Sequence, residues 1–137
     1  MDYDEFTRTL KAELREKGRT ESGPLAGHPL MILTTKGARS GAEREAIVTY
    51  SRQDGDYVIA ASKSGAPTNP AWYHNLVAHP EVKVEANRET FRARARVTNG
   101  EERDRLWEQH ATALPWFREY PTKTDRVIPV IVLERVA

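Results

Sequence analysis

Two tight turns restrict the fold of this chain more than any other feature. Asp54-Gly55 precedes the apolar run at 57–61, and Asn87-Arg88 separates the runs at 82–86 and 90–97. Turns this short join antiparallel strands directly and leave no room for the helix that a parallel connection needs. We therefore predict hairpins and a mostly antiparallel sheet rather than βαβ units.

Short apolar runs supply six predicted strands. The 90–97 run alternates small or apolar residues with arginine, which is typical of a strand with one buried and one solvent-exposed face. The last run is apolar on both faces, and its Pro129 indicates an edge or a bulge. We expect the first three strands to form an antiparallel meander and the sheet to close or half close into a small barrel. The predicted strands are 30–35, 44–52, 57–61, 82–86, 90–97 and 126–135.

An amphipathic pattern predicts a helix over residues 2–17. Phe6, Leu10 and Leu14 recur every four residues, and Gly18 stands where a helix usually ends. The remaining side chains are mostly charged, so only a narrow stripe can be buried. We expect this helix to pack on the domain; contact with a membrane surface or a partner is the alternative.

Two further helices are expected outside the sheet. The shorter has Asn69 as N-cap and Pro70 at the first helical position. The longer begins at Asn99, which with Glu102 resembles a capping box, and runs to about Ala113. The fold expected is thus mainly β, of the α+β class, with six antiparallel strands and about three flanking helices.

Composition limits the organisation and the function. The 137 residues suffice for one domain, 1–137. A net charge of +1 argues against a nucleic-acid binder, and the absence of Cys excludes disulfides and thiolate chemistry. No apolar run reaches the length of a membrane span, and no signal peptide is evident, so a cytoplasmic location is expected.

A cationic cluster is the first candidate site. Its members lie in the turn after the first strand or at the end of the third strand, so a meander would bring them to one concavity. Backbone N–H groups of the turn would add donors for an anion. The alternative is ordinary decoration of hairpin turns. The cluster comprises Lys36, Arg39, Arg44 and Lys63, and the backbone donors are Gly37, Ser40 and Gly41.

Aromatic residues form the second candidate site. Such side chains either line a site for a planar ligand or belong to the core. The histidines lack the spacing of a helical zinc site, so no metal is expected. Ser62 does not lie in the Gly-x-Ser-x-Gly motif that surrounds a hydrolase nucleophile. Chemistry that the side chains cannot do unaided would therefore need a cofactor. The aromatic residues are Trp72, Tyr73, Trp116, Phe117 and Tyr120.

Four segments resemble the deazaflavin-dependent nitroreductase family. They are Leu33-Thr34-Thr35-Lys36-Gly37-Ala38-Arg39-Ser40-Gly41, Ala61-Ser62-Lys63-Ser64-Gly65, Asn69-Pro70-Ala71-Trp72-Tyr73-His74-Asn75-Leu76 and Thr124-Asp125-Arg126-Val127-Ile128-Pro129-Val130. The resemblance runs from about Leu30 to the C-terminus. It implies a split β-barrel that binds coenzyme F420 and reduces quinones, nitro groups or activated alkenes.

The resemblance also implies roles for individual residues. Ala38, Arg39, Ser40 and Arg44 match positions that hold the coenzyme's phosphate and acidic tail. Two further segments match positions that flank the coenzyme, and Ser62 lies near the deazaflavin ring in that match. The first segment is Glu45, Ala46, Ile47, Val48 and Thr49, and the second is Ala60, Ala61, Ser62 and Lys63. Ala71, Trp72, Tyr73, His74 and Asn75 match the helix start that closes the other side.

The acceptor wall departs from the family pattern. Leu114 and Phe117 stand where the family often has tyrosine, whereas Tyr120 keeps that residue type. We expect Phe117 and Tyr120 to contact a hydrophobic acceptor such as a quinone, with Ser62 and Tyr120 as catalytic candidates. FMN on the same barrel, or non-catalytic carriage of the deazaflavin, are the alternatives. The expected partner is a small-molecule acceptor, and the chain is expected to be a monomer or a homodimer.

Overall fold

The computed structural model describes residues 3–21, 23 and 25–136. Asp2, where the first helix is predicted to begin, lies outside these residues. The elements are α1 (Tyr3–Lys17), β1 (Leu30–Lys36), β2 (Glu43–Thr49), β3 (Ser51–Gln53), β4 (Asp56–Ala60), the 3₁₀ helix η1 (Lys63–Gly65), α2 (Ala71–Ala78), β5 (Glu81–Ala86), β6 (Glu89–Val97), α3 (Gly100–Ala113), the 3₁₀ helix η2 (Pro115–Thr122) and β7 (Val130–Arg135).

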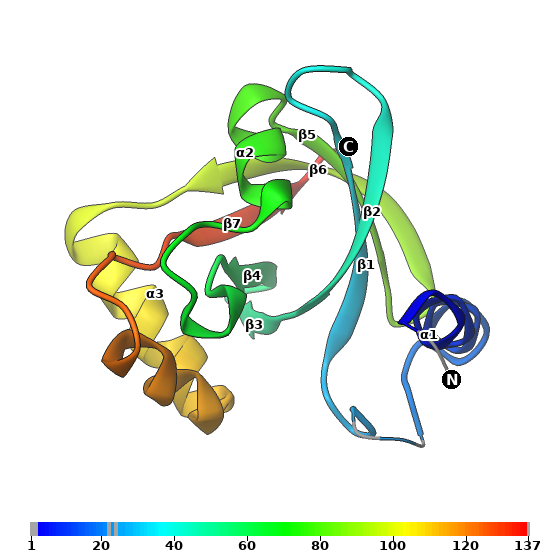
Figure 1. Ribbon diagram of the computed structural model, residues 1–137, viewed down its shortest axis with the longest axis horizontal. Helices are drawn as coiled ribbons and strands as arrows, with labels where there is room; N and C mark the ends of the chain where they lie inside the picture. The colour runs from blue at the N-terminus through cyan, green and yellow to red at the C-terminus, as the bar shows by residue number, and fades with distance from the viewer. Residues whose placement is uncertain (1–2, 22, 24, 137) are drawn as a thin grey trace.

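The strands form one antiparallel sheet that curls into a half-barrel (Figure 1). Its order is β2-β1-β5-β6-β7-β4-β3, and both predicted tight turns join paired strands, β3 to β4 and β5 to β6. The α+β split-barrel class is confirmed. The described strands number seven, so the prediction of six is wrong by one.

The extra strand arises at Tyr50, which divides the predicted strand 44–52. The Tyr50 backbone N–H donates to the Pro29 carbonyl at 2.9 Å, and the chain passes there from β2 at one end of the sheet to β3 at the other. β2 therefore pairs with β1 alone, while β3 pairs with β4. The predicted meander of the first three strands is only partly right: both of its antiparallel pairings occur, but they lie at opposite ends of the strand order because β2 and β3 are separate strands.

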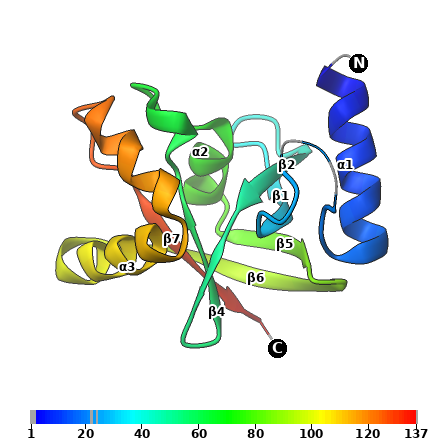
Figure 2. The same ribbon diagram turned by 90° about the horizontal axis from the view of Figure 1, so that it is seen from below.

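The C-terminal strand β7 lies between β6 and β4 in the sheet (Figure 2). Val130 to Leu133 are buried on both faces, as predicted. Pro129 precedes the strand instead of marking an edge, and its carbonyl accepts a hydrogen bond from Ala61 N–H at 2.9 Å. A proline has no N–H to donate, but before the first residue of the strand this costs no ladder hydrogen bond.

Apolar side chains of the sheet meet inside the curl. Met31, Leu33, Ile59, Val84 and Ile131 are fully buried there. On the outer face, Leu10 and Leu14 of α1 pack on Leu30 and Ile32. Figure 2 shows α1 beside β1 and β2, at one end of the strand order, and α3 beside β7 and β4, toward the other end.

The predicted helix caps are only partly right. Pro70, not Asn69, is the N-cap of α2, because the Asn69 side chain instead accepts a hydrogen bond from Arg126. Asn99 is the N-cap of α3 but makes no side-chain capping bond, and Glu102 pairs with Arg96 at 2.7 Å in place of a capping box. None of the helices in the described part of the chain has the length and apolar character needed to cross a bilayer.

Candidate functional site

A cavity of about 450 Å³ lies between β2 and the end of β4. Its walls come from β2, from the segment after β4, from the start of α2 and from η2. Ten of the candidate site residues named from the sequence line it together, although they come from four separate segments. They are Ile47, Val48, Thr49, Ala60, Ser62, Lys63, Trp72, Trp116, Phe117 and Tyr120, joined by Ser64 and Pro70. We call this space the central cavity.

The β2 wall carries polar groups that the sheet does not use. β2 is an end strand and pairs only with β1. One row of its backbone N–H and C=O groups therefore faces away from the ladder. From Thr49 to Arg44 this edge extends over roughly 17 Å. The edge can hold a long, flat ligand along its length.

Arg126 fixes the wall formed by the segment after β4. Its guanidinium donates to the carbonyls of Ser62, Ala66 and Ala61 at 2.6, 2.9 and 3.0 Å, and to Asn69 Oδ1 at 2.8 Å. Burial lowers the pKa of this guanidinium, which nevertheless stays charged. No role is predicted for Arg126 from the sequence, and only its place in the Thr124-Asp125-Arg126 motif could have drawn attention to it.

A glycine allows η1 and η2 to approach closely beside the cavity. Gly65 has a φ of +82°, and a Cβ built there would lie 2.9 Å from Lys123 Cβ and 3.1 Å from the Tyr120 carbonyl oxygen. Lys63 and Ser64 before it also have positive φ values, of 47° and 55°. The loop is therefore held in a conformation that orients Ser62 and Lys63 toward the cavity.

Aromatic rings in mutual contact form the η2 wall. Phe117 is buried and meets Tyr120 edge to face at 5.1 Å between ring centroids. Trp116 is 36% exposed and stacks on His28 at 4.6 Å. The aromatic pair predicted to contact the acceptor, Phe117 and Tyr120, thus lines the cavity with Trp116 beside it.

A buried histidine supports this wall from behind. His110 meets Phe117 edge to face at 4.6 Å, and its Nδ1 lies 2.6 Å from Ser51 Oγ. Ser51 Oγ also accepts a hydrogen bond from Gln53 Nε2 at 3.2 Å. Burial lowers the pKa of His110 to about 4, so the ring is neutral at pH 7. His110 is therefore part of the structure behind the site.

The turn after β1 is tied to α2. Asn75 Oδ1 accepts from Ala38 N–H at 3.0 Å, and Asn75 Nδ2 donates to Thr35 Oγ1 at 3.1 Å. The expectation that Gly37 and Gly41 offer free N–H groups to an anion is wrong. These groups donate within the turn, to Ala42 and Gly37 carbonyls at 2.7 and 2.8 Å.

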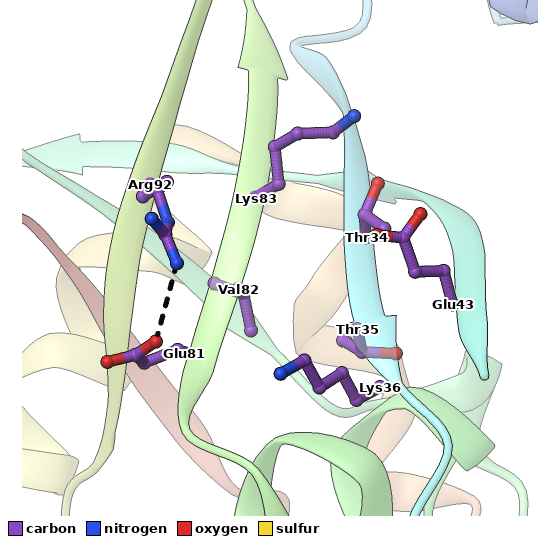
Figure 3. A pocket seen from close by; sticks show the side chains of 8 residues that line it. All are labelled: Thr34, Thr35, Lys36, Glu43, Glu81, Val82, Lys83 and Arg92. Carbon is purple, nitrogen blue, oxygen red and sulfur yellow. Dashed lines mark ion pairs between the residues drawn. The ribbon is translucent and has the colours of Figure 1, made fainter. Parts of the chain in front are cut away.

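The four predicted cations do not gather in one cavity. Lys63 lines the central cavity. Lys36 lines a separate hollow of about 290 Å³, with Lys83 and Arg92, where the pairing of β1 with β5 ends (Figure 3). The cause is the division of the predicted second strand at Tyr50, because three strands, β5, β6 and β7, then lie between β1 and β4 in the sheet.

Arg39 and Arg44 lie at the outer end of the β2 edge. Both are exposed, and neither makes an ion pair within residues 3–21, 23 and 25–136. Ser40 is also exposed, and its hydroxyl accepts from Ala42 N–H at 3.1 Å. This end of the edge is thus cationic and open to solvent.

The other predicted site residues lie around the cavity rather than in its lining. Glu45 is engaged by α1, with Lys11 at 2.9 Å and Arg15 at 2.6 Å, and the Lys11 hydrogen bond is the main cause of its lowered pKa. The rest belong to the core or to exposed positions of α2. Ala61 is buried, Ala46 and Tyr73 are partly buried against the core, and Ala71 and His74 are exposed.

Similar sequences have been described. The family described as F420H(2)-dependent quinone reductase matches residues 6–135. An F420H(2)-dependent quinone reductase of Mycobacterium tuberculosis (strain ATCC 25618 / H37Rv) is 37% identical over 113 residues, which cover 78% of this chain and 74% of the relative.

Solved structures share the fold. One, described as an F420-H2 dependent reductase, is 40% identical, with a TM-score of 0.71 over 77% of this chain and 94% of its own. Another, described as a domain-swapped dimer, is 35% identical, with a TM-score of 0.73 over 97% of this chain and 100% of its own.

Proposed function

This chain belongs to the F420H(2)-dependent quinone reductase family, and from that membership we propose that its central cavity is where a hydride passes from reduced coenzyme F420 to a quinone-type acceptor. The protein is an oxidoreductase, and coenzyme F420 is its cofactor. The observation that carries the assignment of the site is the central cavity, where predicted coenzyme residues and predicted acceptor residues meet.

The residues present fit this coenzyme. A flat ring can lie against the β2 edge at Ile47 and Thr49, with Ser62 opposite. The acidic end of the molecule can then reach the exposed guanidiniums of Arg44 and Arg39, about 17 Å along the same edge. When bound, the deazaflavin supplies a hydride donor that the side chains lack. Lys36 faces a different hollow, so we leave it out of the proposed coenzyme set.

The chain's own residues position the acceptor, shield the reacting atoms from solvent and protonate the reduced acceptor. Phe117 is an apolar face against which an acceptor ring can lie, and close approach of donor and acceptor supplies much of the rate enhancement. The Ser62 hydroxyl lines the cavity and can donate to the oxygen on which negative charge develops. Arg126 donates to the Ser62 carbonyl and so holds the backbone that carries this hydroxyl.

Tyr120 is the proposed proton donor for the reduced acceptor. Its ring is half-buried and fixed by Phe117, and its side chain lines the central cavity. A phenol within reach of the acceptor oxygen can deliver the proton after hydride transfer, and solvent can replace it because the cavity opens to the surface. Ser62 and Tyr120 are therefore the proposed catalytic residues.

The experiment that tests the function uses the protein as isolated. Titration with coenzyme F420 and, separately, with FMN should show tight binding of F420 only. Reduced F420 should then be oxidised when menadione is added. If F420 binds and no acceptor is reduced, the protein is a carrier rather than a reductase.

The oligomeric state expected is a monomer or a homodimer. The relative described as a domain-swapped dimer is similar over nearly the whole chain and favours the homodimer. Light scattering coupled to gel filtration distinguishes the two states by mass.

A further inference from the structure

Trp116 stands between two cavities. It lines the central cavity, and it also lines a cavity of about 400 Å³ on the side of the loop at 26–29. Among the described residues, it is the one that both cavities share. Its side chain is 36% exposed and borders open space on two sides, so packing holds it less firmly than it holds the buried Phe117.

The ring of His28 supplies a contact that holds Trp116. The two rings stack with 4.6 Å between their centroids and 19° between their planes. Aromatic rings in this arrangement attract each other beyond the area that they bury. Within residues 3–21, 23 and 25–136, no hydrogen bond or ion pair engages the His28 imidazole, so its ring is committed to the contact with Trp116.

The backbone of the loop fixes His28 in turn. Its N–H donates to the Leu25 carbonyl at 3.0 Å. Pro29 follows it, and a residue before proline is confined largely to extended backbone. The Pro29 carbonyl accepts from Tyr50 N–H at 2.9 Å, which ties the loop to the sheet between β2 and β3. The loop can therefore hold a ring at a set place opposite η2.

The position of Trp116 affects the proposed acceptor site. Its ring lies 5.9 Å from that of Phe117, at an angle of 43°. Phe117 is the face against which the acceptor ring is proposed to lie, so a shift of Trp116 would change the shape of the cavity beside that face. A wall that is fixed before the acceptor arrives costs less entropy when the acceptor binds.

We propose that His28 is a positioning residue for the acceptor, because it holds Trp116 in the wall of the central cavity. This inference rests on the proposed function and adds the loop before β1 to the residues that set acceptor affinity. His28 is not part of the lining of the central cavity, so it acts through Trp116.

The test measures the KM for menadione and the Kd for F420. His28→Ala and His28→Gln both remove the ring, and each should raise the KM about threefold to tenfold, the factor that corresponds to an aromatic pair. The kcat and the F420 Kd should stay within about twofold, as expected when ground-state and transition-state binding weaken alike. His28→Phe restores a ring and should restore the KM. His79→Ala, at a half-buried position outside both cavities, is the control and should leave the KM unchanged.

A double variant distinguishes positioning from a general loosening of the loop. Trp116→Ala should itself raise the KM for menadione. Adding His28→Ala should raise it no further, because the ring through which His28 acts is already absent. A loop that had merely become less stable would raise the KM by the same factor with or without Trp116.

Acrylamide quenching of tryptophan fluorescence gives a readout that needs neither coenzyme nor turnover. The difference between the wild type and Trp116→Ala isolates the signal of Trp116. His28→Ala should increase the quenching of this signal, because one face of the indole is uncovered, whereas His28→Phe should not. In the Trp116→Ala background, His28→Ala should cause no increase.

Three results would overturn the inference: an unchanged KM in both His28→Ala and His28→Gln, a further rise of the KM by the same factor in the double variant, or a His28→Phe variant that behaves like His28→Ala. Failure of the wild type to oxidise reduced F420 with menadione would instead contradict the proposed function, and acrylamide quenching would still test the contact between His28 and Trp116.

Discussion

Arg126 makes more hydrogen bonds across the candidate site than any other side chain described, four in all. Lys cannot reproduce them because it lacks the planar fork of donors. We expect Arg126→Lys to lose at least about 2 kcal/mol of unfolding free energy, measured by urea denaturation, and to weaken F420 binding. Arg118→Lys is the matched control. Arg118 pairs with exposed Glu108, so its loss should cost less than about 1 kcal/mol. Equal effects of the two variants would contradict the role of Arg126.

Tyr120 can be tested at the level of a single oxygen. Tyr120→Phe keeps the ring against Phe117 and removes the hydroxyl. Coenzyme affinity should stay unchanged, and turnover should fall by less than about a thousandfold, because solvent replaces a donor of this kind and such donors contribute roughly 10²–10⁴-fold. Stopped-flow oxidation of bound reduced F420 is the measurement. Complete loss of hydride transfer would show that Tyr120 is an obligatory acid and that solvent cannot replace it.

Arg39 and Arg44 should hold the acidic end of the coenzyme by charge. Arg39→Ala or Arg44→Ala should weaken F420 binding by about 1–3 kcal/mol. Binding to the wild type should weaken as salt rises, because exposed charges are screened over about 10 Å at 0.1 M. Arg92→Ala, in the separate hollow of Figure 3, should change neither property. A dissociation constant that is independent of salt would contradict this assignment.

At the level of elements, His110 links α3 and η2 to β3 and makes stability depend on pH. Its folded pKa of about 4 lies below the usual 6.5, so the unfolded chain takes up this proton first as the pH falls. The contribution of His110 to the unfolding free energy should not change with pH above pH 6.5. It should then fall by up to about 3 kcal/mol as the pH drops from 6.5 to 4. Urea denaturation across this range measures the loss.

Two variants decide whether His110 is the cause. His110→Gln should remove most of the pH dependence between 6.5 and 4. His74→Gln, at an exposed position of α2, should retain it. A wild type with constant stability over this range would show that His110 is not buried as a neutral ring.

Local patterns in the sequence predict the elements well and their partners poorly. The turns at Asp54-Gly55 and Asn87-Arg88 and the alternation in β6 are local signals, and each appears in the structure as expected. The division at Tyr50 is not local. It depends on a hydrogen bond to Pro29 and on which strands complete the curl, so the pattern over 44–52 reads as one strand.

The same limit applies to the site. Residues that line the central cavity are predicted where they belong to motifs, as with Ser62, Trp72 and Tyr120. Lys36 is assigned to the same site because of the expected meander, and the structure separates it from Lys63. Arg126 is missed because its partners lie 57 to 65 residues earlier in the chain, and no spacing rule covers such contacts.

For the molecule as a whole, the coenzyme should act as a stabilising ligand, since the central cavity lies between the two ends of the curled sheet. A ligand that binds only the folded chain raises the unfolding free energy by about 2.7 kcal/mol at a concentration of 100 times Kd. Thermal denaturation with F420 and with FMN measures this. F420 should raise Tm in proportion to the logarithm of its concentration, whereas FMN at equal concentration should not. Equal shifts would favour FMN as an alternative cofactor.

The position of β7 has a consequence for biosynthesis. β7 follows every other strand in the sequence, yet it lies between β6 and β4 and hydrogen-bonds to both. On the ribosome, the hairpins β1–β2, β3–β4 and β5–β6 can form as they emerge, but β3–β4 cannot join the rest until Val130 to Arg135 leave the exit tunnel. Until that moment β4 and β6 each expose an unpaired edge. The chain is thus most open to aggregation, and to exchange of β7 with a neighbouring chain, in the interval before β7 pairs with β4 and β6.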